Sequence, residues 1–373
     1  MAVEPLRAVV VGCRVGRNHA EAYVHSAETE LVALCDIDAT TLNRVADQHD
    51  VEGRYDDYET MLDEVRPDIV SVATAQPLHA EMTILAATKY TPKAILCEKG
   101  MANNMGEARA MLRACDANDV KLIIGHEGRQ FGIIERAREL IAQGAIGEPL
   151  LHHVWYGQGG MMNQMCHGCD RAMYIMSDPD PAWVIANVQR ESDRWERGWP
   201  AEEMAAGLVG FPNGMRLILE GETPPGEPEE NHRHTIIGTD GQLVVRTEGE
   251  VKDPAATPEG SLGLKLLRGS GSGWETFPFP GETYLDCRRR EIETLALWAK
   301  GEVEGHRQDA HLCILTQEIL MAIYESARTH TLVDLPLRTN ASPLVEMINS
   351  GDLPVRFPGR YDIRHRGVLP PSA

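Results

Sequence analysis

The sequence predicts two α/β parts: a doubly wound parallel sheet at the N-terminal end, then an α+β domain with a largely antiparallel sheet flanked by helices. Strand-like and helical patterns alternate as far as Gly125, a rhythm typical of parallel sheets. After a helical stretch over 133–143, strand-like runs follow one another directly, which favours antiparallel pairing. At 373 residues, 43% of them hydrophobic, the chain is long enough for two cores. We expect domains over 1–126 and 127–340, and a Pro-rich tail over 341–373.

The expected elements follow from apolar runs and turn residues. In the first domain, strands are predicted at 6–11, 31–35, 69–73, 94–97 and 120–125, with helices such as 17–26 and 39–49 between them. In the second domain, strands are predicted at 150–156, 182–190, 207–211, 215–220, 234–237 and 242–246. Pro and Gly at 224–228 and 269–273 mark turns.

Composition limits the kind of partner. The formal net charge is −20, and no cluster of Lys and Arg suited to phosphate backbones is visible, which argues against nucleic acid and anionic membranes. The first strand begins by Leu6, and no apolar run approaches membrane-spanning length, so we expect a cytoplasmic protein. Eight scattered cysteines, several in apolar strands, fit reduced buried thiols. Small molecules are the expected partners.

A glycine turn separates the first strand from the first helix. Gly12-Cys13-Arg14-Val15-Gly16 brings backbone N–H groups and a helix N-terminus to one point, an arrangement that suits a pyrophosphate. The spacing is G-x-x-x-G, without the middle glycine of the usual G-x-G-x-x-G pattern. Alone, this turn is a weak signal.

The second strand ends in Asp36, which lies 24 positions after Gly12. A carboxylate there accepts hydrogen bonds from an adenosine ribose. Ile37 and Asp38 offer no cation for a 2′-phosphate, which favours NAD over NADP. The alternative is that Asp36-Ile37-Asp38 caps the helix over 39–49. The two roles are compatible, one on each aspartate.

Leu96-Cys97-Glu98-Lys99-Gly100 places a lysine directly after the short strand 94–97. Ligands of open α/β sheets bind beyond the carboxyl ends of the strands, so a cation at this point indicates chemistry. The alternative is a solvated Glu–Lys pair.

These residues resemble the Gfo/Idh/MocA family of oxidoreductases of sugars and cyclitols. Further landmarks occur in family order: Thr74-Ala75-Gln76-Pro77-Leu78-His79, Gly144-Ala145-Ile146-Gly147, Phe211-Pro212-Asn213-Gly214, Ile236 to Gly241, Ala322 to Ala327, and Leu335-Pro336-Leu337. The resemblance implies a Rossmann first domain with NAD as cofactor. It implies these cofactor-binding residues: Gly12, Arg14, Val15, Gly16, Asp36, Ile37, Thr74, Gln76, His79, Glu98, Lys99 and His126.

A second constellation, Gly159 to Asp170, resembles the family segment G-G-…-D-x-x-x-H-x-x-D. His167 and Asp170 fall on the family histidine and aspartate, and Asn163 falls on the position of an acid. Spacings of four and three place the three on one helical face. Lys99, His167 and Asn163 are therefore the predicted catalytic residues. A neutral histidine accepts the hydroxyl proton, and a lysine ammonium stabilises the developing alkoxide.

Two departures from the family pattern affect this assignment. Asn163 removes a negative charge that would support a cationic His167 or Lys99. Gly100 replaces the proline that commonly follows Glu-Lys, and glycine holds the lysine less firmly.

The residues predicted to contact substrate are Arg129, Asn163, His167, Asp170 and Trp195. Trp195 and Trp199 offer aromatic faces for a sugar, and the alternative is that they anchor a subunit contact. Cys166-His167-Gly168-Cys169 suggests a metal site, but no second such pair supplies the three or four ligands that zinc requires, so no metal is assigned.

The predicted function is NAD-dependent oxidation of a secondary hydroxyl of a sugar, glycoside or cyclitol by hydride transfer to nicotinamide. One alternative is a glycosidase, lyase or epimerase that keeps NAD bound and uses transient oxidation. Another is a non-catalytic NAD or sugar sensor. Strands of mixed polarity in the second domain, together with the resemblance, predict an open sheet face that pairs subunits into a homodimer or homotetramer. The tail from Ala341 is expected to pack on a neighbouring subunit or on the first domain, and the alternative is a disordered end.

Overall fold

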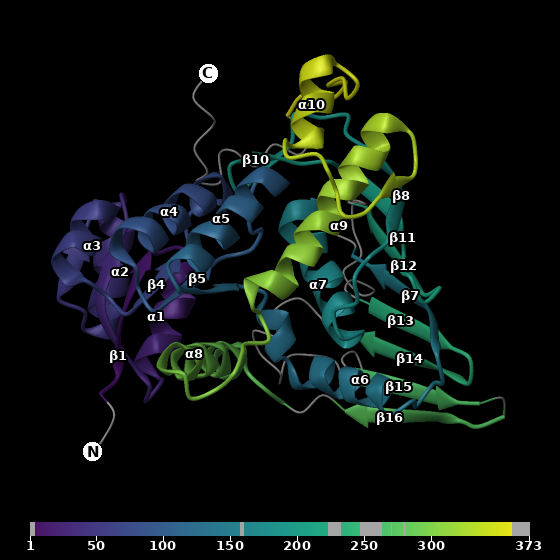
Figure 1. Cartoon of the computed structure of the whole chain (residues 1–373), viewed down its shortest axis with the longest axis horizontal. Helices are drawn as coiled ribbons and strands as arrows, with labels where there is room; N and C mark the ends of the chain where they lie inside the picture. Colours follow the sequence, from purple (N-terminus) through teal and green to yellow (C-terminus); the bar gives the residue numbers. More distant parts are fainter. Residues whose placement is uncertain are drawn as a thin grey trace. The chain divides into compact units, whose positions relative to one another are not determined.

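The computed structural model describes residues 4–156, 160–222, 233–246, 263–269, 271–278 and 281–359. The chain forms two compact units (Figure 1). The first contains Met1–Gln130 and Leu285–Ile314, and the second contains Phe131–Tyr284 and Leu315–Ala373. Segment 285–314 therefore belongs to the first unit, which a single cut after residue 126 does not anticipate. It packs there because Ile292, Leu295 and Ala296 are buried in an apolar cluster with strand residues such as Leu34.

The first unit contains a six-stranded parallel sheet in the order β3-β2-β1-β4-β5-β6, and the predicted doubly wound sheet is confirmed. Its strands are β1 Leu6–Val11, β2 Thr29–Cys35, β3 Gly53–Tyr55, β4 Ile69–Val72, β5 Ala94–Cys97 and β6 Lys121–Ile124. Its helices are α1 Gly16–Val24, α2 Ala39–His49, α3 Tyr58–Val65, α4 His79–Leu85, α5 Met105–Ala117 and α8 Tyr284–Lys300. Short helical turns are η1 Gln76–Leu78, η2 Ala86–Tyr90 and η3 Glu127–Gln130.

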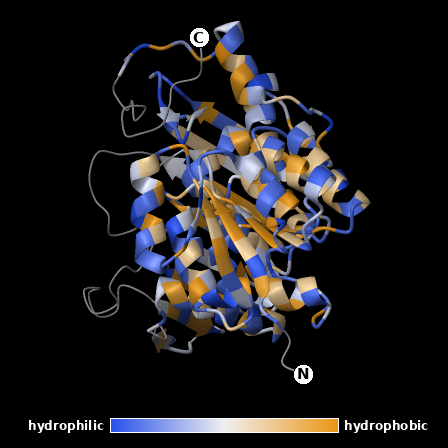
Figure 2. Ribbon diagram, turned by 90° about the vertical axis from the view of Figure 1, so that its left-hand side faces the viewer, coloured by the Kyte–Doolittle hydropathy of each residue, from blue (hydrophilic) through white to orange (hydrophobic). Residues whose placement is uncertain are grey.

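Alternation along β1 explains why helices cover both faces of this sheet. Val9 and Val11 face a cluster that includes Met61 of α3. Ala8 and Val10 face the opposite cluster, which includes Tyr23 of α1. β4 and β5 are buried along their whole length, as expected of parallel strands, and the strands carry much of the hydrophobic colour in Figure 2.

The second unit contains a nine-stranded sheet in the order β16-β15-β14-β13-β7-β12-β11-β8-β17. Only β7 and β12 pair in parallel among the described strands of this sheet, so the largely antiparallel prediction is confirmed. Its strands are β7 Pro149–Trp155, β8 Trp183–Gln189, β11 Met204–Gly210, β12 Arg216–Glu222, β13 Arg233–Gly238, β14 Gly241–Arg246, β15 Gly263–Arg268, β16 Trp274–Pro278 and β17 Val333–Asp334. A separate hairpin pairs β9 Trp195–Glu196 with β10 Trp199–Pro200.

The helices of this unit are α6 Gly132–Ala142, η4 Met161–Met165, α7 Cys166–Ile175 and α10 Pro343–Ser350; α9 Ala310–Thr329 begins in the first unit. Helices α6 and α7 pack on the nine-stranded sheet. Along β8, the side chain of Val184 is buried and that of Ile185 is 48% exposed. This sheet therefore has one packed face and one accessible face.

The described part of the tail is anchored. Leu344 and Met347 of α10 are buried. The backbone N–H groups of Arg356 and Phe357 donate to the Glu191 carbonyl at 2.6 and 2.8 Å. The turns expected at 224–228, position 270 of the turn at 269–273, and the tail beyond Gly359 lie outside the described residues.

All eight cysteines lie in described segments, and they are buried free thiols. Within those segments, no helix has the length and hydrophobicity needed to cross a membrane.

Candidate active site and cofactor site

The glycine turn of the first unit has the shape that a dinucleotide requires. Gly12 has φ +88°, and a Cβ there would lie 2.4 Å from the Ala73 carbonyl oxygen. A Cβ at Gly16 would lie 2.6 Å from Cγ1 of Val10, so both glycines permit close packing of α1 on the sheet. No side chain caps the N-terminus of α1, where Val15 is the capping residue. Backbone N–H groups at this helix start fit a pyrophosphate.

Asp36 is fixed by backbone donors at the carboxyl end of β2. Its Oδ2 accepts from Cys13 N at 2.7 Å, and its Oδ1 accepts from Asp38 N at 2.9 Å. Asp38 caps α2 by accepting from Thr40 N at 3.1 Å. The capping role therefore falls on Asp38, and Asp36 keeps lone pairs for ribose hydroxyls. Ile37, between them, is 81% exposed.

Polar side chains after β4 hold the loop after β5. The two ring nitrogens of buried His79 lie 2.8 Å from the Gly100 carbonyl oxygen and 3.2 Å from that of Thr74. Burial lowers the pKa of His79, which keeps the imidazole neutral at pH 7. Gln76 is also buried and donates to the Ala102 carbonyl at 3.4 Å. The peptide bond between Lys99 and Gly100 is cis.

Glu98 and Lys99 are both buried at the end of β5. Glu98 turns its carboxylate toward α1 and α8, where Oε1 lies 3.0 Å from Nε2 of His19 and 2.9 Å from Nη2 of Arg288. Its Oε2 accepts from the backbone N–H of Lys99 at 3.2 Å. These contacts make Glu98 a support for the lysine backbone, a role that the sequence did not predict.

Two further predicted residues of the first unit are interior. His126 is buried, and Arg129 has no exposed surface and donates from Nη1 to the Arg307 carbonyl at 2.9 Å. Substrate contact by Arg129 stays a prediction.

The second unit holds the other predicted catalytic residues. Asn163 lies in η4, a single wide turn, and His167 and Asp170 follow in α7. His167 is 8% exposed, and Asp170 is buried and accepts from Oγ1 of Thr316 at 3.3 Å. Gly159, at the start of this motif, lies outside the described residues.

A buried carboxylate stands beside Asn163. Nδ2 of Asn163 donates to Oε2 of Glu196 at 2.9 Å, and Oδ1 accepts from Nε of Arg197 at 2.7 Å. Glu196 also accepts from Gly160 N at 3.0 Å and pairs with Arg194. Sequence reasoning missed Glu196, which restores a negative charge next to the amide that replaced the family acid.

The β9–β10 hairpin carries both this carboxylate and half-buried Trp195. Its two-residue turn is Arg197-Gly198, with φ values of +49° and +85°. An x-Gly pair between two short runs is a hairpin signal that could have revealed this element. Trp195 pairs with Pro200 across the hairpin.

No group of three or more His, Cys, Asp or Glu side chains is arranged to hold a metal within the segments that the structure describes. Cys166 and Cys169 are buried free thiols there.

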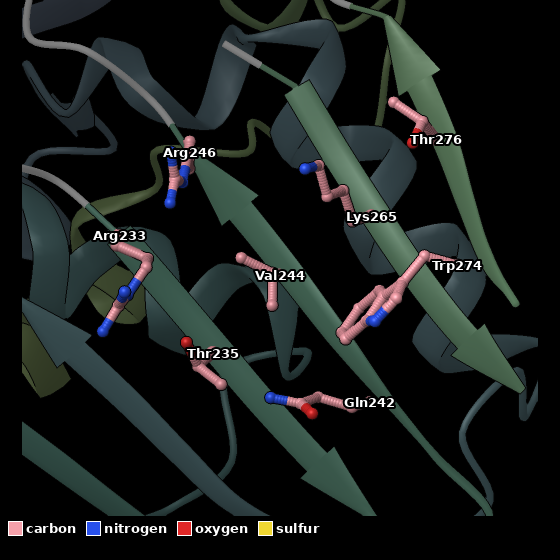
Figure 3. Close-up of a pocket in the computed structure, with 8 residues that line it drawn as sticks. All are labelled: Arg233, Thr235, Gln242, Val244, Arg246, Lys265, Trp274 and Thr276. Carbon is pink, nitrogen blue, oxygen red and sulfur yellow. The ribbon is translucent and has the colours of Figure 1, made fainter. Parts of the chain in front are cut away.

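A pocket lies on the nine-stranded sheet (Figure 3). None of the predicted catalytic residues lines it. Its lining residues are Arg233, Thr235, Gln242, Val244, Arg246, Lys265, Trp274 and Thr276. Arg233 and Arg246 stand directly opposite each other in register. Like charges at such positions are unfavourable, so this face favours acidic neighbours.

Comparison with known proteins identifies the family. Residues 6–126 match the model of the Gfo/Idh/MocA oxidoreductase family with an NAD-binding Rossmann fold. A D-xylose 1-dehydrogenase [NADP(+)] of Haloarcula marismortui is 34% identical over 291 residues, which cover 72% of this chain and 74% of that protein. The chain belongs to the Gfo/Idh/MocA family and is an NAD(P)-dependent oxidoreductase acting on CH–OH groups.

Two further comparisons extend over most of the chain. A D-apiose dehydrogenase of Rhizobium rhizogenes is 25% identical over 359 residues, which cover 90% of this chain and 99% of that protein. The structure of a levoglucosan dehydrogenase in complex with NADH and levoglucosan matches with a TM-score of 0.75 and 20% identity, covering 90% of this chain and 100% of that one. At 20% identity, the likeness to the levoglucosan dehydrogenase structure shows the fold alone.

Proposed function

We propose that this enzyme oxidises a secondary hydroxyl of a sugar, glycoside or cyclitol with NAD as the hydride acceptor. The observation that carries the proposal is the buried Lys99 at the carboxyl end of β5, in the same unit as the glycine turn. His167, on α7, supplies the base. The names of two relatives, a xylose and an apiose dehydrogenase, support a sugar as substrate.

The chemistry divides among few residues. When bound, the nicotinamide accepts the hydride that leaves the substrate carbon. Gly12 and Gly16 admit the pyrophosphate, and Asp36 accepts from the ribose. His167 as a neutral imidazole takes the hydroxyl proton, and the ammonium of Lys99 stabilises the oxygen as its charge develops.

The deciding experiment incubates purified enzyme with NAD and a panel of sugars, inositols and glycosides. NADH absorbance that rises with one substrate, with a product two hydrogens lighter, supports net oxidation. If a product forms without net release of NADH, the proposal is wrong. The enzyme would then keep its cofactor bound and oxidise the substrate transiently, as an epimerase, lyase or glycosidase does. Ligand binding with no product across the panel points to a sensor.

We expect the enzyme to bind NAD(H) more tightly than NADP(H). The Asp36 carboxylate accepts from a ribose 2′-OH and repels a 2′-phosphate. Asp36→Ala should weaken NAD binding and narrow the gap between the two cofactors in a fluorescence titration. Asp38→Ala is the comparison variant: it removes the α2 cap and a neighbouring negative charge but leaves the Asp36 carboxylate in place, so it should narrow the gap between the two cofactors less than Asp36→Ala does. A lower Kd for NADP than for NAD in the wild type contradicts the assignment.

We also expect a homo-oligomer. The nine-stranded sheet has an accessible face that carries exposed Ile185, Ile237 and Trp274. Apolar side chains gathered on such a face favour a second subunit. Light scattering at micromolar concentration should give at least twice the 41.2 kDa of one chain, and a mass near 41.2 kDa contradicts the expectation.

A further inference from the structure

A residue on α8, distant in sequence from every recognised motif, contacts the carboxylate that precedes the catalytic lysine. We propose that Arg288, acting through Glu98, is the positioning residue for Lys99. The inference rests on the role given to Lys99 in the proposed function, and it adds a component that neither the glycine turn nor the Glu-Lys motif contains.

Glu98 connects Arg288 to the lysine. The two oxygens of its carboxylate have separate tasks, because Oε1 meets Arg288 and His19 while Oε2 accepts from the Lys99 backbone N–H. Space for the carboxylate comes from Gly125, where a Cβ would lie 3.0 Å from Oε1. A bidentate carboxylate held on both sides fixes the start of the loop that carries the lysine side chain.

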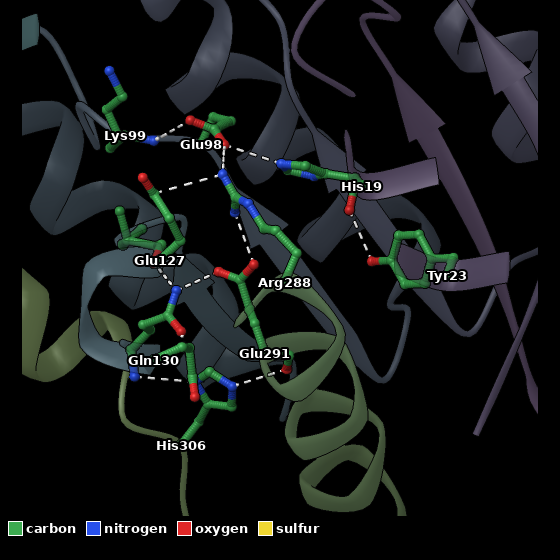
Figure 4. A network of polar contacts seen from close by, with 12 residues as sticks. His19, Tyr23, Glu98, Lys99, Glu127, Gln130, Arg288, Glu291 and His306 are labelled. Atoms are coloured by element: carbon green, nitrogen blue, oxygen red, sulfur yellow. Dashed lines mark hydrogen bonds and ion pairs between the residues drawn. The ribbon is translucent and has the colours of Figure 1, made fainter. Parts of the chain in front are cut away.

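Arg288 is itself fixed. Its side chain is 2% exposed and reaches three carboxylates: Nη2 lies 2.9 Å from Oε1 of Glu98 and 3.6 Å from Oε2 of Glu127, and Nη1 lies 2.7 Å from Oε2 of Glu291 (Figure 4). The planar guanidinium suits such divergent pairing, which a single ammonium does not reproduce.

Neutral side chains connect the middle of α8 to the parallel sheet. The side chain of Gln308 donates to Glu291 and, at 3.1 Å, to the carbonyl of Ile124 at the end of β6. Nε2 of His306 lies 3.1 Å from the Glu291 carbonyl, and burial lowers the pKa of His306 to about 4, so this histidine is neutral. Arg288 therefore approaches Glu98 from a rigid support.

The charges in this cluster favour an ionised Glu98. Burial raises the pKa of Glu98, but Arg288, His19 and Lys99 together outweigh burial and hold it well below its usual range. The carboxylate is thus a negative charge that interacts electrostatically with Lys99 at neutral pH.

Substitutions of Arg288 and Glu98 should shift the pKa of Lys99 in opposite directions. Arg288→Met removes a cation and leaves the carboxylates, so the pKa of Lys99 should rise. Glu98→Gln removes an anion, so the pKa of Lys99 should fall. Among the described contacts, the titratable and charged groups that act on Glu98 or Lys99 include His19 of α1, His79 of α4 and Arg288 of α8, and Arg288 in turn pairs with Glu127 of η3 and Glu291 of α8.

The experiment compares Arg288→Met, Arg288→Lys and Glu98→Gln with a matched control, Arg289→Met. Arg289 is the next residue on α8, and its side chain is 45% exposed and 4.0 Å from Glu293. We expect kcat to fall roughly 10- to 100-fold in Arg288→Met, the cost of a slightly misplaced catalytic group. KM and Kd for NAD should stay near wild type, Arg288→Lys should recover part of kcat, and Arg289→Met should match wild type.

A second readout does not depend on turnover. Protein labelled with ¹³C at lysine Cε gives a Lys99 resonance, assigned by its loss in Lys99→Arg, whose titration should move upward in Arg288→Met and downward in Glu98→Gln. If the wild type oxidises no substrate, the proposed function fails and this titration still tests the contact. Unchanged kcat and unchanged Lys99 titration in Arg288→Met overturn the inference. Equal losses in Arg288→Met and Arg289→Met, or a parallel loss of NAD affinity, also overturn it.

Arg288→Met leaves buried carboxylates without their cation and is the variant most prone to misfold. Should it fail to give soluble protein, Glu98→Gln and Arg288→Lys decide. A Lys99 titration and a kcat that match wild type in both of these variants contradict the positioning role.

Discussion

Replacing Lys99 or His167 by alanine should lower turnover by at least ~10²-fold, the smaller end of the effect of a general acid–base group. Both side chains are nearly buried and lie on rigid elements, at the end of β5 and in α7. Neither forms the glycine turn or touches Asp36 in the described contacts. NADH binding should therefore remain close to wild type, and steady-state kinetics with fluorescence titration separate the two effects.

Surface variants provide the controls for this prediction. Lys93→Ala removes a lysine that is 52% exposed beside Asp68, and His153→Ala removes a partly exposed histidine beside Glu220. Both should retain normal turnover. Asn163→Ala should give an intermediate loss, because the amide orients a hydroxyl and holds Glu196 without taking a proton. Normal turnover in His167→Ala would move the role of base to Lys99.

A chain ended after Thr339 should be markedly less stable than the full chain. The deletion removes α10, whose Leu344 and Met347 are buried. Burying one such side chain contributes about 1.5–3 kcal/mol, so losing two costs roughly 3–6 kcal/mol of the free energy of unfolding. Thermal denaturation followed by circular dichroism measures the loss.

The same deletion removes three bonds to Glu191: the backbone N–H groups of Arg356 and Phe357 donate to its carbonyl, and Nη1 of Arg356 pairs with its carboxylate at 3.1 Å. A chain ended after Gly359 keeps every described contact and is the matched control. An unchanged melting temperature after deletion from residue 340 would show that α10 contributes nothing to the second unit. A change in mass by light scattering would add support to a tail that lies along a subunit contact.

Much of the fold follows from local patterns. β1, β4 and β5 are short apolar runs bounded by turns, and each was predicted within one residue. β3 was missed because Gly53-Arg54-Tyr55 has no apolar run. β16 was missed because most of its residues are exposed, so hydrophobic periodicity does not reveal it.

The site was predictable only where its chemistry sits in a contiguous motif. Asp38 as a cap follows from its position before a helical pattern. Glu196 and Arg288 do not follow, because their partners are 33 and 190 positions away and no sequence period links them. A contact of this kind depends on where α8 or the β9–β10 hairpin packs in the folded protein, and one sequence alone contains no pattern that shows this.

Segment 285–314 returns to the first unit after residues 131–284 have formed part of the second, so neither unit is continuous in the sequence. During synthesis, the strands of the parallel sheet leave the ribosome long before α8 exists. Until then Glu98 and Glu127 lack Arg288, and Ala8 and Val10 lack the apolar side of α8. The nucleotide-binding half therefore cannot complete its core as an early, self-sufficient product of translation, and its maturation waits for nearly the whole polypeptide. Genes that encode only the first 130 residues would yield an open, partly charged interior in place of a working cofactor domain.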